Sequence, residues 1–419
     1  MARFAAADTA APTEPPHPVR WLMLAGVWLL YFCFGVTSTG LAPLIAPILR
    51  DLDISHTQMG TVLGAWQLVY IVSAVPCGAM LDRLGPRRAL FIGALLIALS
   101  GLLRSVSVDF WSLFLAVAVF GLGGPIVSAG APKVVSLWFH GRERGLAMGI
   151  YITGPALGAI VSLSLANSVF MPAFDNDWRE VLRLWSAVAV AMGVLWMLLT
   201  LHPAAKAMER KIAAEPRVRQ REVLMQLLQL PAMRIVLLMS VGAFTFNHGL
   251  HNWLPELLRS QGMSAVAAGY WASVPTAVGI AGSLLIPRFA TPEHRFSILL
   301  GLCAAAGLAS LFLHADAGPL LLVGLVLQGI VRSSIVTVTV LTLVELPGVE
   351  QRHAGTASGL FFSAAEVGGV TGPLALGVLY DATGGFDAGL YMLTGVTILL
   401  AVAVFRLRAM SARQAEGEA

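Results

Sequence analysis

Long uninterrupted runs of apolar residues fill this chain and are separated by short polar stretches. A helix needs about 20 apolar residues to cross the hydrocarbon core of a bilayer, and runs of this kind outnumber the alternating segments of about ten residues that are typical of membrane strands. The pattern predicts spanning helices at 21–47, 58–80, 89–107, 110–138, 145–170, 182–201, 233–257, 267–290, 296–314, 318–344, 355–379 and 388–408. The fold class is therefore predicted to be an all-α membrane protein with twelve transmembrane helices.

One long hydrophilic stretch divides these runs into two sets of six. Residues 202–232 form this break, and their periodicity suggests an amphipathic helix lying at the membrane surface. The sequence thus predicts five regions: a disordered cytoplasmic tail (1–20), a first six-helix bundle (21–201), a cytoplasmic linker (202–232), a second six-helix bundle (233–408) and a cytoplasmic C-terminal tail (409–419).

The two halves share sequence motifs at nearly one offset. The motif Arg142-x-x-Gly145-x-Ala147-x-Gly149 returns 210 residues later as Arg352-x-x-Gly355-x-Ala357-x-Gly359. A second motif returns after 209 residues: Ile48-Leu49-Arg50, Ile54-Ser55 and Gly60 match Leu257-Leu258-Arg259, Met263-Ser264 and Gly269. Gly154-Pro155 has a looser counterpart in Gly372-Pro373. The chain is therefore predicted to be a duplicated six-helix unit, and repeats paired around a central cavity are typical of secondary transporters.

The composition excludes most soluble functions. Of the 419 residues, 57% are apolar and 12% are charged, whereas soluble domains are about 25% charged. This argues against a cytoplasmic enzyme or a nucleic-acid binder and makes the lipid bilayer the main partner. The three cysteines, Cys33, Cys77 and Cys303, are scattered within apolar runs, which predicts neither a disulfide framework nor a metal site. No Gly-x-x-x-x-Gly-Lys motif is present, so we do not expect ATP to drive the protein directly, and we expect no cofactor.

The basic residues predict the orientation of the chain in the membrane. With both termini inside, most Lys and Arg fall on the inner side, and the outer loops receive little beyond Arg50, Arg179, Arg183 and Arg259. Cytoplasmic loops carry such an excess of basic residues. We therefore expect a multi-pass protein of the cytoplasmic (inner) membrane with both termini in the cytoplasm.

The stretch after the second predicted helix reads Gly78-Ala79-Met80-Leu81-Asp82-Arg83-Leu84-Gly85-Pro86-Arg87-Arg88. It resembles the cytoplasmic signature between helices 2 and 3 of the major facilitator superfamily, with Pro86 in place of the first basic residue of its final pair. The resemblance implies two pseudo-symmetric six-helix bundles that rock about a central cavity. It also implies a gating role for Gly78, Asp82, Arg83, Gly85, Arg87 and Arg88, in which Gly78 permits close helix approach and Asp82 caps a helix or pairs across the seam between the halves.

The seventh predicted helix carries a polar cluster on an otherwise apolar background. Asn247, His248, His251 and Asn252 lie at spacings of three and four residues and so share one side of the helix. The segment ends in Trp-Leu-Pro and resembles the cyanate and nitroimidazole transporter branch of the superfamily. Such polar residues should face the bundle interior, where they are candidates for cargo binding. A metal site at His-x-x-His and a purely structural hydrogen-bonded cluster are the alternatives.

Four formal charges lie within apolar runs. Arg104 and Lys133 are near helix ends, where long side chains can reach the interface. Arg332 and Glu366 are near mid-helix and have no charged counterpart in the other half, which makes them candidates for cargo binding and proton coupling. A guanidinium can hold a planar anion with two hydrogen bonds, and a low dielectric favours the protonated form of a carboxyl group. Alternatively, Arg332 and Glu366 form an ion pair that only neutralises both charges.

Two functions remain in view. The excess of positive charge at Lys133 and Arg332 predicts a transporter of a small anionic solute, driven by protons or by exchange of a counter-ion and working as a monomer. The alternative is a proton-driven multidrug or metabolite exporter, suggested by Gly154-Pro155, which partly resembles an antiporter signature but is also explained as a kink. For either function the predicted cavity includes further polar and aromatic residues: Tyr31, Trp66, Tyr70, Tyr151 and Gln328.

Overall fold

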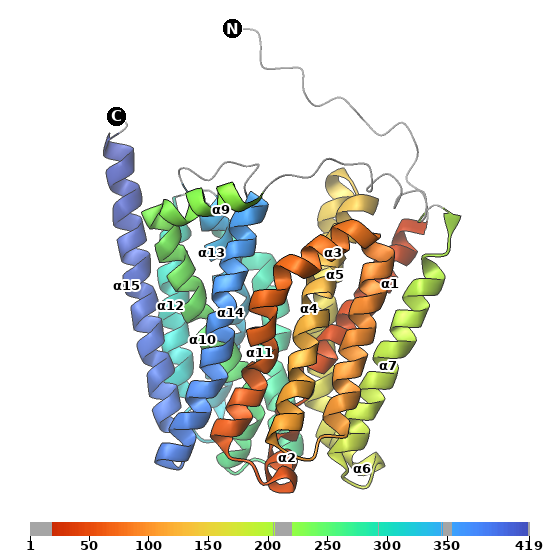
Figure 1. Ribbon diagram of the computed structural model, residues 1–419. Coiled ribbons are helices and arrows are strands. Elements are labelled where there is room, and N and C mark those ends of the chain that lie inside the picture. Colours follow the sequence, from red (N-terminus) through yellow and green to blue (C-terminus); the bar gives the residue numbers. More distant parts are fainter. Residues whose placement is uncertain are drawn as a thin grey trace.

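The computed structural model describes residues 19–203, 205, 220–291, 293–344, 346 and 354–417. The described residues are helical apart from short connections, and ten of their helices are long and apolar enough to cross a membrane (Figure 1). The predicted N-terminal tail falls almost entirely outside the described residues, as does much of the predicted linker.

The helices of the two halves follow one another closely along the chain. The first half contains α1 (Val19–Thr39), η1 (Ala42–Leu44), α2 (Ile45–Leu52), α3 (His56–Ser105), α4 (Phe110–Trp138), α5 (Gly141–Leu165), η2 (Ala166–Phe170), α6 (Met171–Ala173) and α7 (Trp178–Leu199). After α9 (Gln220–Gln229), the second half contains α10 (Pro231–Ser260), α11 (Ala265–Leu285), η3 (Ile286–Phe289), α12 (Arg295–Phe312), α13 (Pro319–Val344), α14 (Ala354–Thr383) and α15 (Asp387–Gly417). The helix α15 thus continues through most of the predicted C-terminal tail.

The predicted spans 58–80 and 89–107 are joined in the single element α3, which is interrupted at Gly85. A straight helix of its 50 residues would be about 75 Å long at 1.5 Å per residue, far more than a bilayer core of about 30 Å. Gly85 has φ 76° and ψ 160°, a backbone conformation that glycine adopts without a steric penalty. The chain therefore reverses at this residue, as the bend of α3 in Figure 1 shows.

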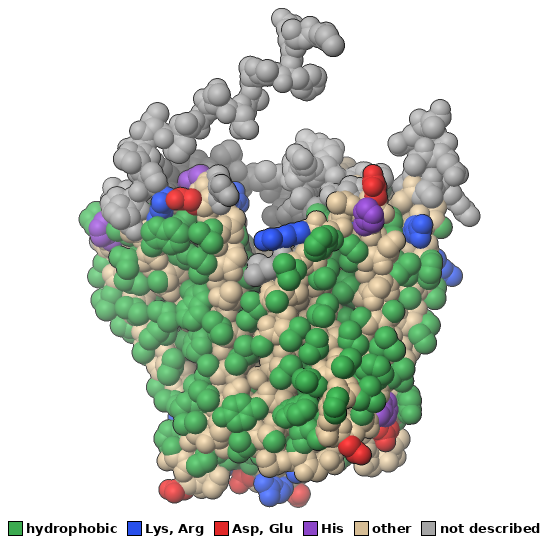
Figure 2. All heavy atoms as spheres, turned by 180° about the vertical axis from the view of Figure 1, so that it is seen from behind, with side chains coloured by type: hydrophobic (Ala, Val, Ile, Leu, Met, Phe, Trp, Pro, Cys, Tyr) green, Lys and Arg blue, Asp and Glu red, His purple; other side chains and the backbone are tan. Residues whose placement is uncertain are grey.

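The two ends of the bundle differ. We call the end at which α1 begins and α15 ends the N/C end, and the opposite end the distal end (Figure 1). The helix α9 lies across the N/C end. Between the two ends, apolar side chains cover the flank of the molecule, whereas charged side chains gather at the ends (Figure 2). This distribution is the one a bilayer requires of the surface that faces lipid.

Equivalent contacts in the two seams between the halves support the predicted duplication. At one seam α3 packs on α14, and a Cβ built on Gly60 would lie 2.5 Å from the Pro373 carbonyl oxygen. At the other seam α11 packs on α5, and a Cβ built on Gly269 would lie 2.2 Å from the Leu163 carbonyl oxygen. Gly269 lies 209 residues after Gly60, and Pro373 lies 210 residues after Leu163. The same contact is thus made twice, once at each seam.

The packing corrects one detail of the predicted repeat. Gly158 lies against the Phe32 carbonyl oxygen, and Gly368 lies against the Val241 carbonyl oxygen. These two contacts are related by the repeat offsets of 210 and 209. Since Pro373 is equivalent to Leu163 in the seams, the matching of Gly154-Pro155 with Gly372-Pro373 was wrong. Gly158 of α5 and Gly368 of α14 thus serve close packing within their own halves.

Glycines at the N/C end have open space instead. A Cβ built on Gly78, Gly145, Gly149 or Gly359 would meet no atom of the described residues within 4 Å. The expectation that Gly78 permits a close helix approach is therefore not met in this conformation. The halves touch at the distal end and stand apart at the N/C end, where Figure 2 shows the surface hollowed between two shoulders.

Candidate functional site: a cavity between the two halves

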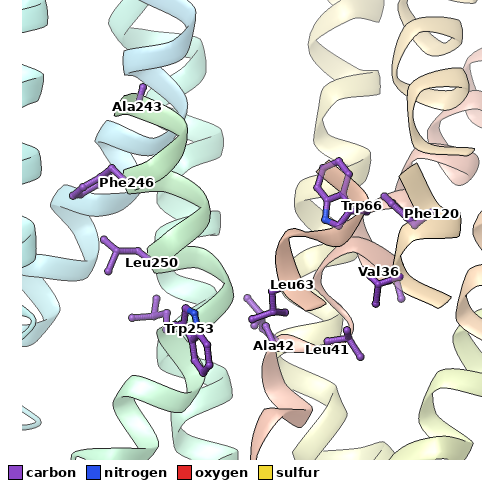
Figure 3. Close-up of a cluster of buried hydrophobic side chains, with 14 of the residues drawn as sticks. Val36, Leu41, Ala42, Leu63, Trp66, Phe120, Ala243, Phe246, Leu250 and Trp253 are labelled. Atoms are coloured by element: carbon purple, nitrogen blue, oxygen red, sulfur yellow. The ribbon is translucent and has the colours of Figure 1, made fainter. Parts of the chain in front are cut away.

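A cavity of about 460 Å³ lies between the halves. Helices α1, α3 and α5 supply its first wall, and helices α10, α11, α13 and α14 supply the second. Figure 3 shows Trp66 on the first wall and α10 opposite, with α10 packed against η1 toward the distal end. Six of the ten predicted cargo-binding residues line this cavity: Trp66, Asn247, His248, His251, Asn252 and Arg332.

Arg332 of α13 is the one formally charged residue among the described residues that line the cavity. Its Nη1 donates to His251 Nδ1 at 2.8 Å and to Thr276 Oγ1 at 3.1 Å. The Asn247 side chain donates to the Arg332 backbone carbonyl at 3.1 Å. Nε and Nη2 of Arg332 donate to no residue in the part of the chain that the structure describes. One side of the guanidinium fork is held in place, and the other side is available to an anion.

The hydrogen bonds of His251 assign its protonation state. Arg332 has only donors, so His251 Nδ1 must accept and carries no proton. The proton of the neutral ring is then on Nε2, which lies 3.1 Å from the Thr39 hydroxyl oxygen on α1 and donates to it. His251 in this conformation is therefore neutral and links the two halves of the protein.

His248 is oriented from the first half as well. The Gln67 side-chain amide of α3 donates to His248 Nδ1 at 3.2 Å, so this ring is also neutral, with its proton on Nε2. Aromatic rings flank it, with centroids of Trp66 at 6.0 Å and Phe244 at 5.2 Å. The described residues contain no group of three or more residues that could hold a metal ion, and both histidines are engaged in hydrogen bonds instead.

Glu366 lies at the seam between α14 and α3 and does not line the cavity. A Cβ built on Gly369 would lie 2.6 Å from Glu366 Oε2 and 2.9 Å from Gln67 Cγ, so these two side chains flank the same point. Oε2 of Glu366 is buried and has no hydrogen-bond partner among the described residues. Since the Arg332 guanidinium donates to His251 and Thr276, the alternative of a mutual Arg332–Glu366 ion pair is wrong for this conformation.

Four predicted cavity residues lie outside the lining. Tyr31 and Tyr151 stack on each other at a centroid distance of 5.7 Å, and Tyr70 shares a hydrogen bond with the Ser128 hydroxyl at 3.2 Å. Gln328 is buried one turn before Arg332 on α13. In this conformation these side chains support the walls from behind and do not form the cavity surface.

The motif around Asp82 is arranged differently from the expectation. Lys133 of α4 donates to the Asp82 carboxylate at 2.5 Å, so Asp82 pairs within its own half and not across the seam. Lys133 is thereby also removed from the cavity, and the expectation that it adds positive charge there is wrong. Arg83 and Arg88 are exposed, whereas the Arg87 carbonyl accepts a hydrogen bond from the Trp196 indole at 3.0 Å.

Arg104 does not reach the membrane interface as expected. Its side chain is 1% exposed and donates to the Thr37 carbonyl at 2.8 Å, and its guanidinium lies 5.6 Å from the centre of the Phe120 ring. Its Nε and Nη2 are buried and have no partner in the part of the chain that the structure describes. The side chain therefore points into the first bundle, and it does not line the cavity.

Sequence reasoning missed three residues that complete the site. Thr39, Gln67 and Thr276 each bond to a predicted cavity residue. The repeat could have identified Thr39, because the offset of 209 relates it to His248, a predicted site residue. Gln67 and Thr276 are equivalent to each other at the same offset, and each supports a site residue in the second half.

Comparisons with known proteins agree with this architecture. Residues 27–347 match the family described as Major Facilitator Superfamily. The chain is 22% identical to a probable galactarate/D-glucarate transporter, GudP, of Escherichia coli (90% of this chain, 92% of the relative) and 24% identical to a hexuronate transporter of Bacillus subtilis (93% of each). It is also 26% identical to the agnestins efflux protein AgnL12 of Paecilomyces divaricatus (73% of this chain, 70% of the relative). The family match covers most of the chain, which therefore belongs to the major facilitator superfamily and is a membrane transporter and not an enzyme.

Proposed function

We propose that this protein is a secondary active transporter that moves a small organic anion by alternating access. The free side of the Arg332 guanidinium, held inside a cavity between the halves, is the observation that carries the proposal. Two of the relatives bear the names of transporters for sugar acids, which are organic anions. Alternating access is supported by halves that touch at the distal end and stand apart at the N/C end.

The number and direction of the spans follow from the same proposal. Ten described helices meet the criteria of length and hydropathy. Two spans from α3, one on either side of Gly85, and α11 would bring the number to twelve, divided into bundles at 21–201 and 233–408 as predicted. The asymmetry of Lys and Arg supports a cytoplasmic N/C end in the inner membrane. The cavity would then open to the cytoplasm, and the protein would work as a monomer.

Glu366 is the proposed site of proton coupling. A buried carboxyl group with an unpartnered oxygen can exist in a protonated and an ionised form. It lies beside Gln67, which holds His248 on the cavity wall. A change in the charge of Glu366 can therefore affect His248 at the cavity wall through the Gln67 side chain alone.

Two finer alternatives remain part of the proposal. The resemblance of α10 to the cyanate and nitroimidazole branch stays a prediction, and the proposed anion does not depend on it. Export of an uncharged or cationic lipophilic compound is the second candidate function. It is favoured by the aromatic residues of the cavity and by the similarity to an efflux protein.

Thermal unfolding of the purified protein separates the two functions. A ligand that binds the native state increases the free energy of unfolding by mass action, by about 2.7 kcal/mol when its free concentration is a hundred times Kd, and so raises the melting temperature. We expect at least one small carboxylate, with benzoate and glucuronate as the probes, to stabilise the protein, and lipophilic cations such as tetraphenylphosphonium to leave it unchanged. Stabilisation by the cations alone would instead establish the exporter.

A further inference from the structure

The cavity carries a single positive charge. Arg332 is the one charged residue of the described lining, and Lys133 is engaged with Asp82 away from it. His248 and His251 both accept hydrogen bonds at Nδ1 and are therefore neutral. The guanidinium fork has only its Nε and Nη2 side free, which matches one carboxylate. A second carboxylate on the cargo would enter the cavity without a counter-charge, and desolvating an unpaired charge is strongly unfavourable.

Five of the seven hydroxyl groups in the described lining are already used as donors. Each of the five donates to a backbone carbonyl of its own helix: Ser38 to Gly35, Thr153 to Ile150, Ser283 to Ile280, Ser333 to Gly329 and Thr337 to Ser333. The unpartnered amide atoms Asn247 Oδ1 and Asn252 Nδ2 are buried. A cargo rich in hydroxyl groups would therefore lose hydrogen bonds to water and regain few in the cavity.

The rest of the lining is apolar and comes from both halves. Four aromatic rings face the cavity: Phe34 and Trp66 from the first half and Phe244 and Phe362 from the second. Trp66 lies near Phe34, at 6.4 Å between ring centroids, and Phe244 lies near Phe362, at 6.3 Å. Apolar surface of this kind is best covered by an apolar cargo.

We propose that the cargo is a monocarboxylate with a predominantly apolar body, whose carboxylate binds the Nε and Nη2 side of Arg332 while its body packs on the four rings. This inference rests on the proposed transport of an organic anion and narrows it to one class. The proposed cargo differs from the sugar acids after which two relatives are named, because sugar acids carry several hydroxyl groups. His251 and Thr276 hold the guanidinium at Nη1, which leaves its Nε and Nη2 side for the carboxylate of the cargo.

Four probes of similar size test the inference on the purified full-length protein by calorimetric titration. Cyclohexanecarboxylate has the proposed chemistry, glucuronate adds hydroxyl groups, cyclohexane dicarboxylate adds a second charge, and cyclohexanecarboxamide removes the charge. We expect cyclohexanecarboxylate to bind at least about tenfold more tightly than each of the others, as expected when a cavity leaves polar groups of a ligand unpaired. Arg332→Gln should remove this binding.

A matched pair of variants tests the apolar contact. Phe362 lines the cavity and is 39% exposed, so Phe362→Ser should leave the fold intact. The same change should weaken the binding of cyclohexanecarboxylate by at least about threefold in Kd. Phe405 of α15 is 56% exposed and does not line the cavity, so Phe405→Ser should leave the Kd unchanged.

The outcomes distinguish the inference from the proposed function. If glucuronate or the dicarboxylate binds as tightly as cyclohexanecarboxylate, and Arg332→Gln removes that binding, the monocarboxylate class is wrong and anion transport stands. An equal effect of the two Phe variants would also overturn the apolar contact. If no carboxylate binds, or if the carboxamide binds as tightly as cyclohexanecarboxylate, anion transport itself is wrong.

Discussion

The Asp381 carboxylate accepts a hydrogen bond from the backbone N–H of Thr57 at 2.7 Å and so joins the end of α14 to the first turn of α3. The same carboxylate accepts from the backbone N–H of His56 at 3.2 Å. A carboxylate at a helix N-terminus is favoured by the free N–H groups and by the helix dipole. Because α3 and α14 belong to different halves, this contact holds the cavity closed at the distal end.

Asp381→Asn should therefore favour the conformation that is open at the distal end. The amide loses the charge and one of the two acceptor oxygens, which weakens the contact by about 1 kcal/mol. We expect faster labelling of a cysteine introduced at Ala42, which is 1% exposed in the present conformation and lies in η1, where η1 packs on α10 of the other half. The labelling rate in membranes is the measurement.

Asp109 provides the matched control for Asp381. It caps α4 within the first half, where its carboxylate accepts from the Ser112 backbone N–H at 2.7 Å. Hydrogen bonds from Ser112 lower the pKa of this carboxyl group, so the cap is retained above that pKa and is lost as the pH falls through it. Asp109→Asn should lower stability without changing the labelling of the distal seam. Equal labelling in the two variants would mean that Asp381 is an ordinary cap.

Asp82→Asn should slow transport and leave the equilibrium affinity for cargo nearly unchanged. Asp82 and Lys133 form an ion pair near the N/C end, and neither lines the cavity. Loss of the pair changes the free-energy difference between conformations and not the contacts with cargo. Transport rates in proteoliposomes and a Kd from titration check this, and a large loss of binding by a folded variant would contradict it.

Arg332→Gln should nearly abolish binding of the anion, and Arg332→Lys should weaken it clearly. Lysine keeps the charge but loses the fork, and removing one partner of a desolvated charged contact typically costs about 2–5 kcal/mol. Titration of the purified variants provides the measurement. A variant that binds normally and only melts at a lower temperature would show that Arg332 supports the fold alone.

Glu366→Gln should abolish accumulation driven by a pH gradient and spare exchange of cargo. Glutamine keeps the shape of the neutral carboxyl group but cannot release a proton. Uptake into proteoliposomes with and without a gradient separates the two activities. Glu256 is a suitable control because it is also buried in the second half but is held by Arg259, whose Nε donates to it at 2.8 Å. Accumulation by the Glu366 variant would move the coupling role to His248 or His251.

The apolar runs made the long apolar helices predictable, because a helix that crosses a membrane must be nearly free of charge along its whole length. The repeat was predictable as well, since Gly60 and Gly269 are needed at equivalent close contacts. The partners of single side chains were not predictable. Lys133 and Asp82 are 51 residues apart, and only the packing of α4 on α3 brings them together. In the same way, α10, α11 and α13 must assemble before His251, Thr276 and Arg332 meet.

The paired contacts of Gly60 with Pro373 and of Gly269 with Leu163 have a consequence for the origin of the molecule. Each half offers a glycine to the other half and receives a glycine in return, which is the reciprocity of an isologous interface between two identical subunits. The present chain is thus built like a homodimer of a six-helix ancestor whose two copies have been fused. The contacts at the two seams should be sufficient for the halves to associate. If the chain is divided between α7 and α9 and the two fragments are produced together, they should therefore assemble in the membrane.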